Sequence, residues 1–160
     1  VFYNRYLNQI DCNLSINQLL VETWQDFESV VKGKNAQWWN TAYAPDKWNP
    51  LEVVMHLIDV ERVYQYRAHC IASGEKGDLP GFDENQYVAN SHARNVDPEL
   101  LISEFELLRK TGMLLFSRLN TAQIQRIGNA NGHPTDVEAL GYITAAHLHH
   151  HTQILKTKYP

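Results

Sequence analysis

The sequence predicts an all-α protein, a four-helix bundle in which a long crossover link joins the second and third helices. Four segments carry apolar residues at helical spacing, and each of them opens with an N-cap signal. No segment shows the convincing alternation of polar and apolar residues that is typical of a strand. The chain of 160 residues is long enough to bury one core, so we expect residues 1–160 to form a single domain.

The first helix is predicted between Ser15 and Gly33. Ser15 and Gln18 match the S-x-x-Q capping box, in which each side chain bonds the backbone N–H of the other residue. An apolar stripe follows, and glycine is common just beyond a helix end. Residues 1–12 lack a clear period, so we expect an irregular or short helical arm there.

The second helix is predicted to follow Asn49 and to end near residues 73–74. Asn49 is a favourable N-cap, and Pro50 suits the first helical position because no backbone N–H is needed there. Glu52 stands where it can complete a capping box with Asn49. A Ser-Gly pair at residues 73–74 marks the end of the helical pattern.

The third and fourth helices are predicted from the same kinds of signal. Asp97 precedes Pro98, and apolar residues then recur at helical spacing as far as residue 119. Thr135 and Glu138 match a T-x-x-E capping box, which predicts a helix over residues 135–158.

Two connections between these helices differ in length. The link between the second and third helices is long and contains the turn-rich residues 79–83, which suits a bundle that is not simply up-down-up-down. Residues 128–134 are predicted to form a shorter polar loop before the fourth helix.

Composition and charge exclude several classes of protein. A hydrophobic fraction of 44% without a run of about 20 apolar residues argues against a membrane protein. The net charge of -4, with scattered basic residues, argues against a nucleic-acid partner. Cys12 and Cys70 match no metal or redox motif, and residues 1–10 do not resemble a signal peptide, so we expect a cytoplasmic location.

Four of the eight histidines fall within residues 147–151. His147 and His151 are four residues apart, so on a helix both imidazoles lie on one face, one turn apart. His150 is three residues from His147 and could replace one member of this pair, whereas His149 is predicted to point away from it. The apolar residues on the same face predict that the pair points into the bundle.

A third donor is predicted at His56, which lies within an apolar stretch where a lone imidazole would be costly to bury. Three neutral imidazoles would leave coordination positions on a divalent ion for water or substrate, as in catalytic sites. The alternatives are a hydrogen-bonded core histidine at His56 and a buried polar network at His147 and His151.

Four ordered motifs stand at residues 43–48 (YAPDKW), 52–62 (EVVMHLIDVER), 79–83 (LPGFD) and 146–151 (AHLHHH). Together these motifs resemble the DinB-like (DinB/YfiT) family, and the resemblance covers nearly the whole chain. One departure is that Ala146 and Leu148 replace the glycine and the acidic residue of the family's GHExHH pattern. If that acid supports a ligand in relatives, the hydrogen bonding of His147 must differ here.

The resemblance implies a four-helix bundle with a divalent metal ion, commonly nickel or zinc, held by His56, His147 and His151. It also implies a metal-dependent hydrolase or a thiol-dependent S-transferase that uses a low-molecular-weight thiol such as bacillithiol or mycothiol. From the residues alone, the alternative is a non-catalytic, metal-stabilised binding or stress-response module. A homodimer is expected because bundles of this size often bury an outer helix face.

Other side chains are candidates for the same site. Asp59 lies one turn from His56 and could act in catalysis by orienting a ligand or binding the ion's water, or instead form an ion pair with Arg62 or Arg67. Arg67 could bind a substrate anion, although we rank a buried salt bridge first. Two groups of aromatic residues could wall or cover a pocket, or simply pack in the core or the link: Trp38, Trp39, Tyr43 and Trp48, and Phe82 and Tyr87.

Overall fold

The computed structural model describes residues 4–159, so residues 1–3 of the predicted arm and Pro160 lie outside the described part. Four long helices make up the bundle: α2 (Ile16–Val31), α4 (Pro50–Ala72), α6 (Pro98–Ser117) and α8 (Val137–Lys158). The short helix α1 (Asn4–Leu7) precedes them. Between them lie the short helices α3 (Ala36–Asn40), α5 (Glu84–Asn90) and α7 (Thr121–Ile124), and a 3-10 turn, η1 (Ala93–Asn95). The strands are β1 (Asp78–Leu79), β2 (Ile127–Ala130) and β3 (His133–Asp136).

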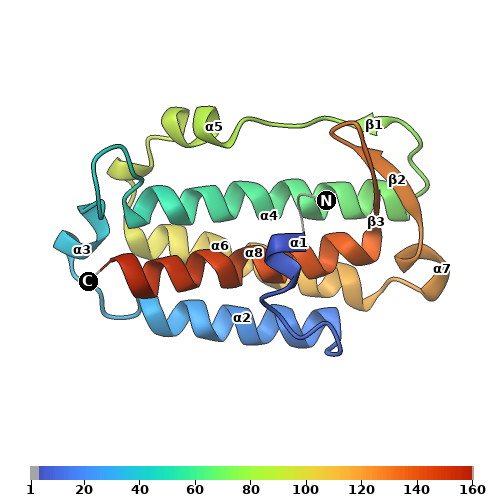
Figure 1. Cartoon of the computed structure of the whole chain (residues 1–160), viewed down its shortest axis with the longest axis horizontal. Coiled ribbons are helices and arrows are strands. Elements are labelled where there is room, and N and C mark those ends of the chain that lie inside the picture. Colours follow the sequence, from blue (N-terminus) through green and yellow to red (C-terminus); the bar gives the residue numbers. More distant parts are fainter. Residues whose placement is uncertain (1–3, 160) are drawn as a thin grey trace.

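The long helices lie side by side, and each has two neighbours. α8 packs between α2 and α4, and α6 packs against α4 and α2 on the other side. α4 and α6 run in the same direction, because the link that carries β1 and α5 returns along the bundle before α6 begins (Figure 1). The predicted four-helix bundle and its long crossover link are therefore confirmed.

The predicted caps explain where three of the helices begin. Both halves of the Ser15–Gln18 box form at the start of α2. Both halves of the Asn49–Glu52 box form at α4. At α6 the Asp97 side chain accepts a hydrogen bond from the backbone N–H of Glu99. Each cap satisfies N–H groups that have no partner within the helix itself.

The predicted start of the fourth helix is wrong by two residues. Thr135 belongs to β3, where its backbone pairs with Gly128 of β2. The cap is Asp136, whose side chain accepts a hydrogen bond from the Ala139 N–H at 2.6 Å. Asp136 is itself a good N-cap residue, and strand pairing excludes Thr135 from the helix.

The bundle also carries a small sheet, which no alternating pattern in the sequence predicted. β1 pairs with β2 in parallel, and β2 pairs with β3 as an antiparallel hairpin in place of the predicted polar loop. Asn131 and Gly132 form the turn with φ values of 54° and 72°. Positive φ at both positions suits a two-residue hairpin loop, and Asn-Gly is its strongest sequence signal. The strands have only two to four residues, too few for an alternating pattern to stand out.

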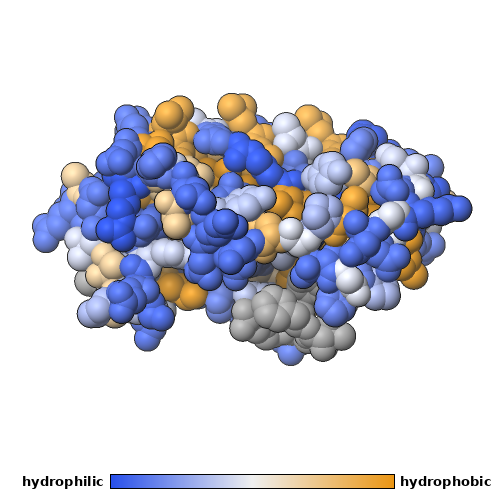
Figure 2. All heavy atoms as spheres, turned by 90° about the horizontal axis from the view of Figure 1, so that it is seen from above, coloured by the Kyte–Doolittle hydropathy of each residue, from blue (hydrophilic) through white to orange (hydrophobic). Residues whose placement is uncertain are grey.

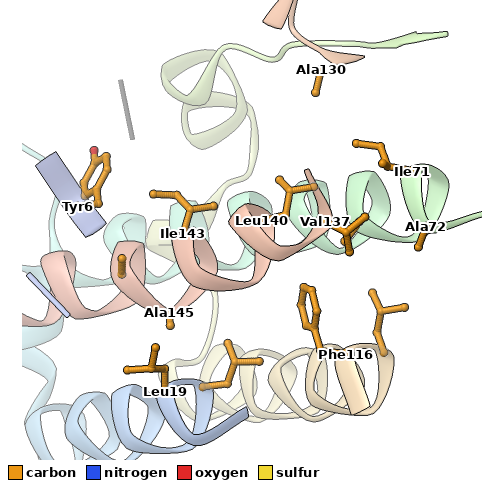
Figure 3. Packing of buried hydrophobic residues seen from close by; sticks show 14 of the residues in the cluster. Tyr6, Leu19, Ile71, Ala72, Phe116, Ala130, Val137, Leu140, Ile143 and Ala145 are labelled. Carbon is orange, nitrogen blue, oxygen red and sulfur yellow. The ribbon is translucent and has the colours of Figure 1, made fainter. Parts of the chain in front are cut away.

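The buried hydrophobic residues form two clusters along the bundle. One cluster joins α2, α8 and the ends of α4 and α6 beneath the sheet, and includes Leu19, Ile71, Phe116, Leu140 and Ile143 (Figure 3). The other fills the opposite end and includes Phe27, Trp38, Leu57, Phe105 and Leu155. On α8 the first cluster reaches Ala146 and the second begins at Leu148. A polar residue, His147, therefore lies where the two clusters meet.

The outer surface carries both hydrophilic and hydrophobic residues (Figure 2). The side that carries the crossover link is mainly hydrophilic, with hydrophobic residues visible between the polar ones (Figure 2). Among the described residues, no helix combines the length and the hydropathy that crossing a membrane requires.

Candidate metal centre

The structure brings together the three histidines predicted from the sequence. His56 projects from α4, and His147 and His151 project from successive turns of α8. One ring nitrogen from each lies within 4.8 Å of the other two. The Nε2 atoms of His56 and His147 are 3.2 Å apart, and the ring centres of His147 and His151 are 4.6 Å apart.

Burial keeps two of these imidazoles, those of His56 and His147, neutral. His56 and His147 are each 6% exposed, and His151 is half-buried. Burial lowers the pKa of His56 from 6.5 to about 4. It also lowers the pKa of His147 well below 6.5, helped by the neighbouring histidines and by Arg109. A neutral imidazole has the free lone pair that a metal ion needs, so His56 and His147 are able to act as ligands at pH 7.

The donor set fits a divalent ion. Two imidazoles bound at about 2.1 Å in a tetrahedral or octahedral site have nitrogens roughly 3.0–3.4 Å apart, which brackets the observed distance of 3.2 Å. The Nδ1 atom of His56 is buried without a hydrogen-bond partner among the described residues, whereas its Nε2 atom faces His147. Three neutral nitrogen donors suit zinc, nickel, copper or iron.

Aromatic side chains pack against the imidazole rings of His56 and His147. Trp48 lies against His56, with ring centres 5.0 Å apart. Tyr6 of α1 meets His147 edge-on at 5.6 Å, and Tyr64 of α4 meets it at 6.4 Å. Neither tyrosine was predicted from the sequence to lie at this site. Tyr64 lies two turns after His56 on the same helix, which is a usable signal, whereas Tyr6 lies in an arm without a period.

His150 does not join the group of three. Its ring packs against Tyr6 at 5.0 Å, and its Nδ1 lies 3.4 Å from the side chain of Gln9. It therefore helps to hold the N-terminal arm against α8. His149, predicted to point away from the pair, is half-buried.

Asp59 lies on the α6 side of α4. Burial raises the pKa of its carboxyl group, while the charge of Arg62 lowers it and that of Glu104 raises it. Arg62 itself pairs with Glu104 of α6. No described contact joins Asp59 to the three histidines, so its role in catalysis stays a prediction.

The salt bridge ranked first for Arg67 is wrong. Arg67 is buried, and it donates a hydrogen bond to the backbone carbonyl of Pro80 at 2.7 Å, which ties the crossover link to α4. The acid that the structure does pair in the core is Glu61, whose carboxylate lies 2.7 Å from Arg109 of α6. Both members of this pair are about 97% buried or more. Glu61 also lines a small void beside His147.

The other aromatic candidates divide between core, link and surface. Trp38 and Trp39 are buried in the second hydrophobic cluster, and Trp48 is the member of the tryptophan group that contacts a histidine. Tyr43 is 40% exposed. Phe82 and Tyr87 pack on one another within the link, with ring centres 5.0 Å apart.

Comparisons with known structures support this fold. YfiT from Bacillus subtilis, described as a probable metal-dependent hydrolase with an unusual four-helix bundle topology, aligns with a TM-score of 0.80 at 20% identity, over 88% of this chain and 82% of that one. A mycothiol-dependent maleylpyruvate isomerase aligns with a TM-score of 0.74 at 11% identity, over 89% of this chain. The alignment spans 61% of the isomerase, so a large part of that protein has no counterpart here.

Comparison of the sequence with protein families and curated proteins adds the family itself. No curated protein is similar enough to match. Residues 19–155 match the DinB superfamily, and that range includes all four long helices except the first residues of α2 and the last of α8. The resemblance noted in the sequence is thus confirmed, and the chain belongs to the DinB superfamily.

Proposed function

We propose that this protein binds one divalent metal ion, nickel or zinc, through His56, His147 and His151, and uses it to act on a small molecule. The reaction is hydrolysis, or transfer to a low-molecular-weight thiol. The observation that carries the proposal is the convergence of three imidazole nitrogens within 4.8 Å from two separate helices. The descriptions of the two similar structures, a probable metal-dependent hydrolase and a mycothiol-dependent isomerase, support the same chemistry.

A bound divalent ion supplies Lewis-acid chemistry, since it lowers the pKa of a coordinated water or thiol towards neutrality. The protein supplies the position of the ligands. Trp48 and Tyr6 press on the rings of His56 and His147 and restrict their rotation. These two histidines are nearly closed to solvent, whereas His151 is half-buried, so a substrate would approach from the side of His151.

The packing favours a catalytic over a structural ion. Large hydrophobic clusters lie on both sides of the three histidines, so the helices are held together by apolar burial without a metal bridge. Three protein ligands, rather than four, also leave a position open, which is the usual arrangement of a catalytic site. A non-catalytic, metal-stabilised module remains the alternative that experiment must exclude.

The test is a panel of thiols and electrophilic or hydrolysable small molecules, run on metal-loaded protein and on the His56→Ala/His147→Ala/His151→Ala variant. Turnover in the first and none in the second supports an enzyme. Equal rates in both remove the proposal. If His151→Ala keeps the activity of the loaded protein but lowers its melting temperature by several degrees, the ion is structural.

The surface of α6 supports the further proposal of a homodimer. Leu100, Leu107 and Leu114 stand seven residues apart and are 61%, 65% and 69% exposed. Seven-residue spacing places them in one stripe along the outer face of the helix. Single exposed leucines are common, but three of them aligned along one face of a helix favour an interface. Four expectations stay predictions: a catalytic role for Asp59, the organisation of residues 1–160 as a single domain, a cytoplasmic location, and the absence of a nucleic-acid partner.

A further inference from the structure

A second candidate site lies at the end of the bundle where α2 and α8 both finish. A cleft of about 640 Å³ opens there between residues 33–43 and the last residues of α8. This volume falls within the range of pockets that hold small molecules, roughly 300–1,000 Å³. No residue of this cleft belongs to the group of three histidines.

Three aromatic rings line the cleft. The ring of Tyr159 meets Trp38 at 6.3 Å and Tyr43 at 5.1 Å, in both cases edge-on. The indole N–H of Trp38 donates to the backbone carbonyl of Tyr159, which fixes the two residues to each other. Tyr43 is 40% exposed, whereas Trp38 and Tyr159 are 7% and 4% exposed. A planar ligand can therefore stack on the Tyr43 ring and meet the exposed edges of the other two.

The charged residues that line the cleft are lysines. Lys34 and Lys158 contribute to it, and no aspartate or glutamate does. Neither lysine has a carboxylate partner within residues 4–159, although Lys110 and Lys156 elsewhere do. The Lys34 ammonium lies 4.9 Å from the centre of the Trp38 ring. In a protein with a net charge of -4, this is a local concentration of unpaired positive charge.

Trp48 connects the cleft to the candidate metal centre, although it lines neither the cleft nor the group of three histidines. The Tyr159 hydroxyl donates a hydrogen bond to the backbone carbonyl of Trp48 at 2.6 Å. The Trp48 ring in turn lies 5.0 Å from that of His56. A molecule in the cleft would therefore lie two side chains from a proposed metal ligand.

We propose that this cleft binds a small organic anion that carries a planar group. The planar group packs on Tyr43 beside the edges of Trp38 and Tyr159, and the anionic group faces the ammonium groups of Lys34 and Lys158. Because the cleft contains none of the three histidines, binding does not require a metal ion. Binding in the cleft can thus be tested independently of the proposed reaction.

The test is an NMR titration of metal-stripped, ¹⁵N-labelled protein with phenyl phosphate, read at the assigned indole N–H of Trp38. Benzyl alcohol supplies the ring without the charge, and inorganic phosphate supplies the charge without the ring. The variant is Lys34→Gln/Lys158→Gln. Its matched control is Lys76→Gln/Lys110→Gln, which removes the same charge from exposed lysines outside the cleft.

We expect saturable shifts confined to residues 33–43 and 158–159. The Kd should rise at least about fivefold in Lys34→Gln/Lys158→Gln and change less than about twofold in the control. Both half-probes should bind at least about tenfold more weakly than phenyl phosphate. The proposal is overturned by no saturable shift up to about 10 mM, by shifts centred elsewhere, by equal loss in the control, or by a half-probe that binds equally well.

Discussion

Replacing His56 by glutamine should change how the stability of the metal-free protein depends on pH. Above pH 6.5 the His56 imidazole is neutral in both the folded and the unfolded chain, so it adds no pH dependence. Burial lowers its folded pKa to about 4. Between pH 6.5 and 4 the unfolded chain therefore binds a proton that the folded chain does not, and the free energy of unfolding falls as the pH falls.

The size of the effect follows from the pKa shift. From 6.5 to about 4, the shift predicts a loss of about 2 kcal/mol by pH 5 and about 3 kcal/mol by pH 4 from this residue alone. Glutamine is neutral at every pH and cannot contribute this loss. His56→Gln should therefore lose about 2 kcal/mol less than the parent protein between pH 7 and pH 5.

The assay is urea unfolding of EDTA-treated protein at pH 7, 6 and 5. His133→Gln is the matched control, because His133 is exposed in β3 and lies outside the three-histidine group. Comparing each variant with the parent at the same pH removes the contribution of the other titrating groups. Identical pH slopes for the parent and His56→Gln would refute the reasoning, since they would mean that His56 is not a buried neutral imidazole.

Three further predictions concern the buried ion pair, the hairpin turn and the outer face of α6. Arg109→Met should cost about 3–5 kcal/mol in urea unfolding by leaving Glu61 buried and unpaired, and Glu61→Met in the same chain should recover most of it; a loss below about 1 kcal/mol contradicts a buried pair. Gly132→Ala should lower stability by about 1 kcal/mol in thermal unfolding, because its φ of 72° strains an L-residue, and no change would argue against this turn. Leu107→Glu should shift the protein from dimer to monomer in light scattering, and an unchanged mass excludes α6 as the interface.

Local signals were enough to predict the bundle. The boxes at Ser15 and Asn49 and the cap at Asp97 form as expected, since they depend on residues within one helical turn. The hairpin was not predicted, although Asn131-Gly132 is a strong hairpin-turn signal, because its strands are short and their partner β1 lies 51 residues earlier in the chain. Pairing in that sheet also moves the helix N-cap from Thr135 to Asp136.

The part of the candidate site that depends on helix geometry was predictable from the sequence. The spacing of His147 and His151 places both on one face, and the apolar setting of His56 predicts that it faces inward. The partner of Arg67 was not predictable, because it is a backbone carbonyl whose position depends on the path of the link. The contact of Tyr6 with His147 depends in the same way on how the arm folds back onto α8.

Calorimetric titration of EDTA-stripped protein with Ni²⁺ or Zn²⁺ tests the metal centre most directly. We expect one ion per chain and a Kd that rises at least about hundredfold in each of His56→Ala, His147→Ala and His151→Ala, but not in His133→Ala. Binding that is absent from the parent protein, or that survives unchanged in the triple-alanine variant, would contradict the assignment of these three imidazoles as the ligands.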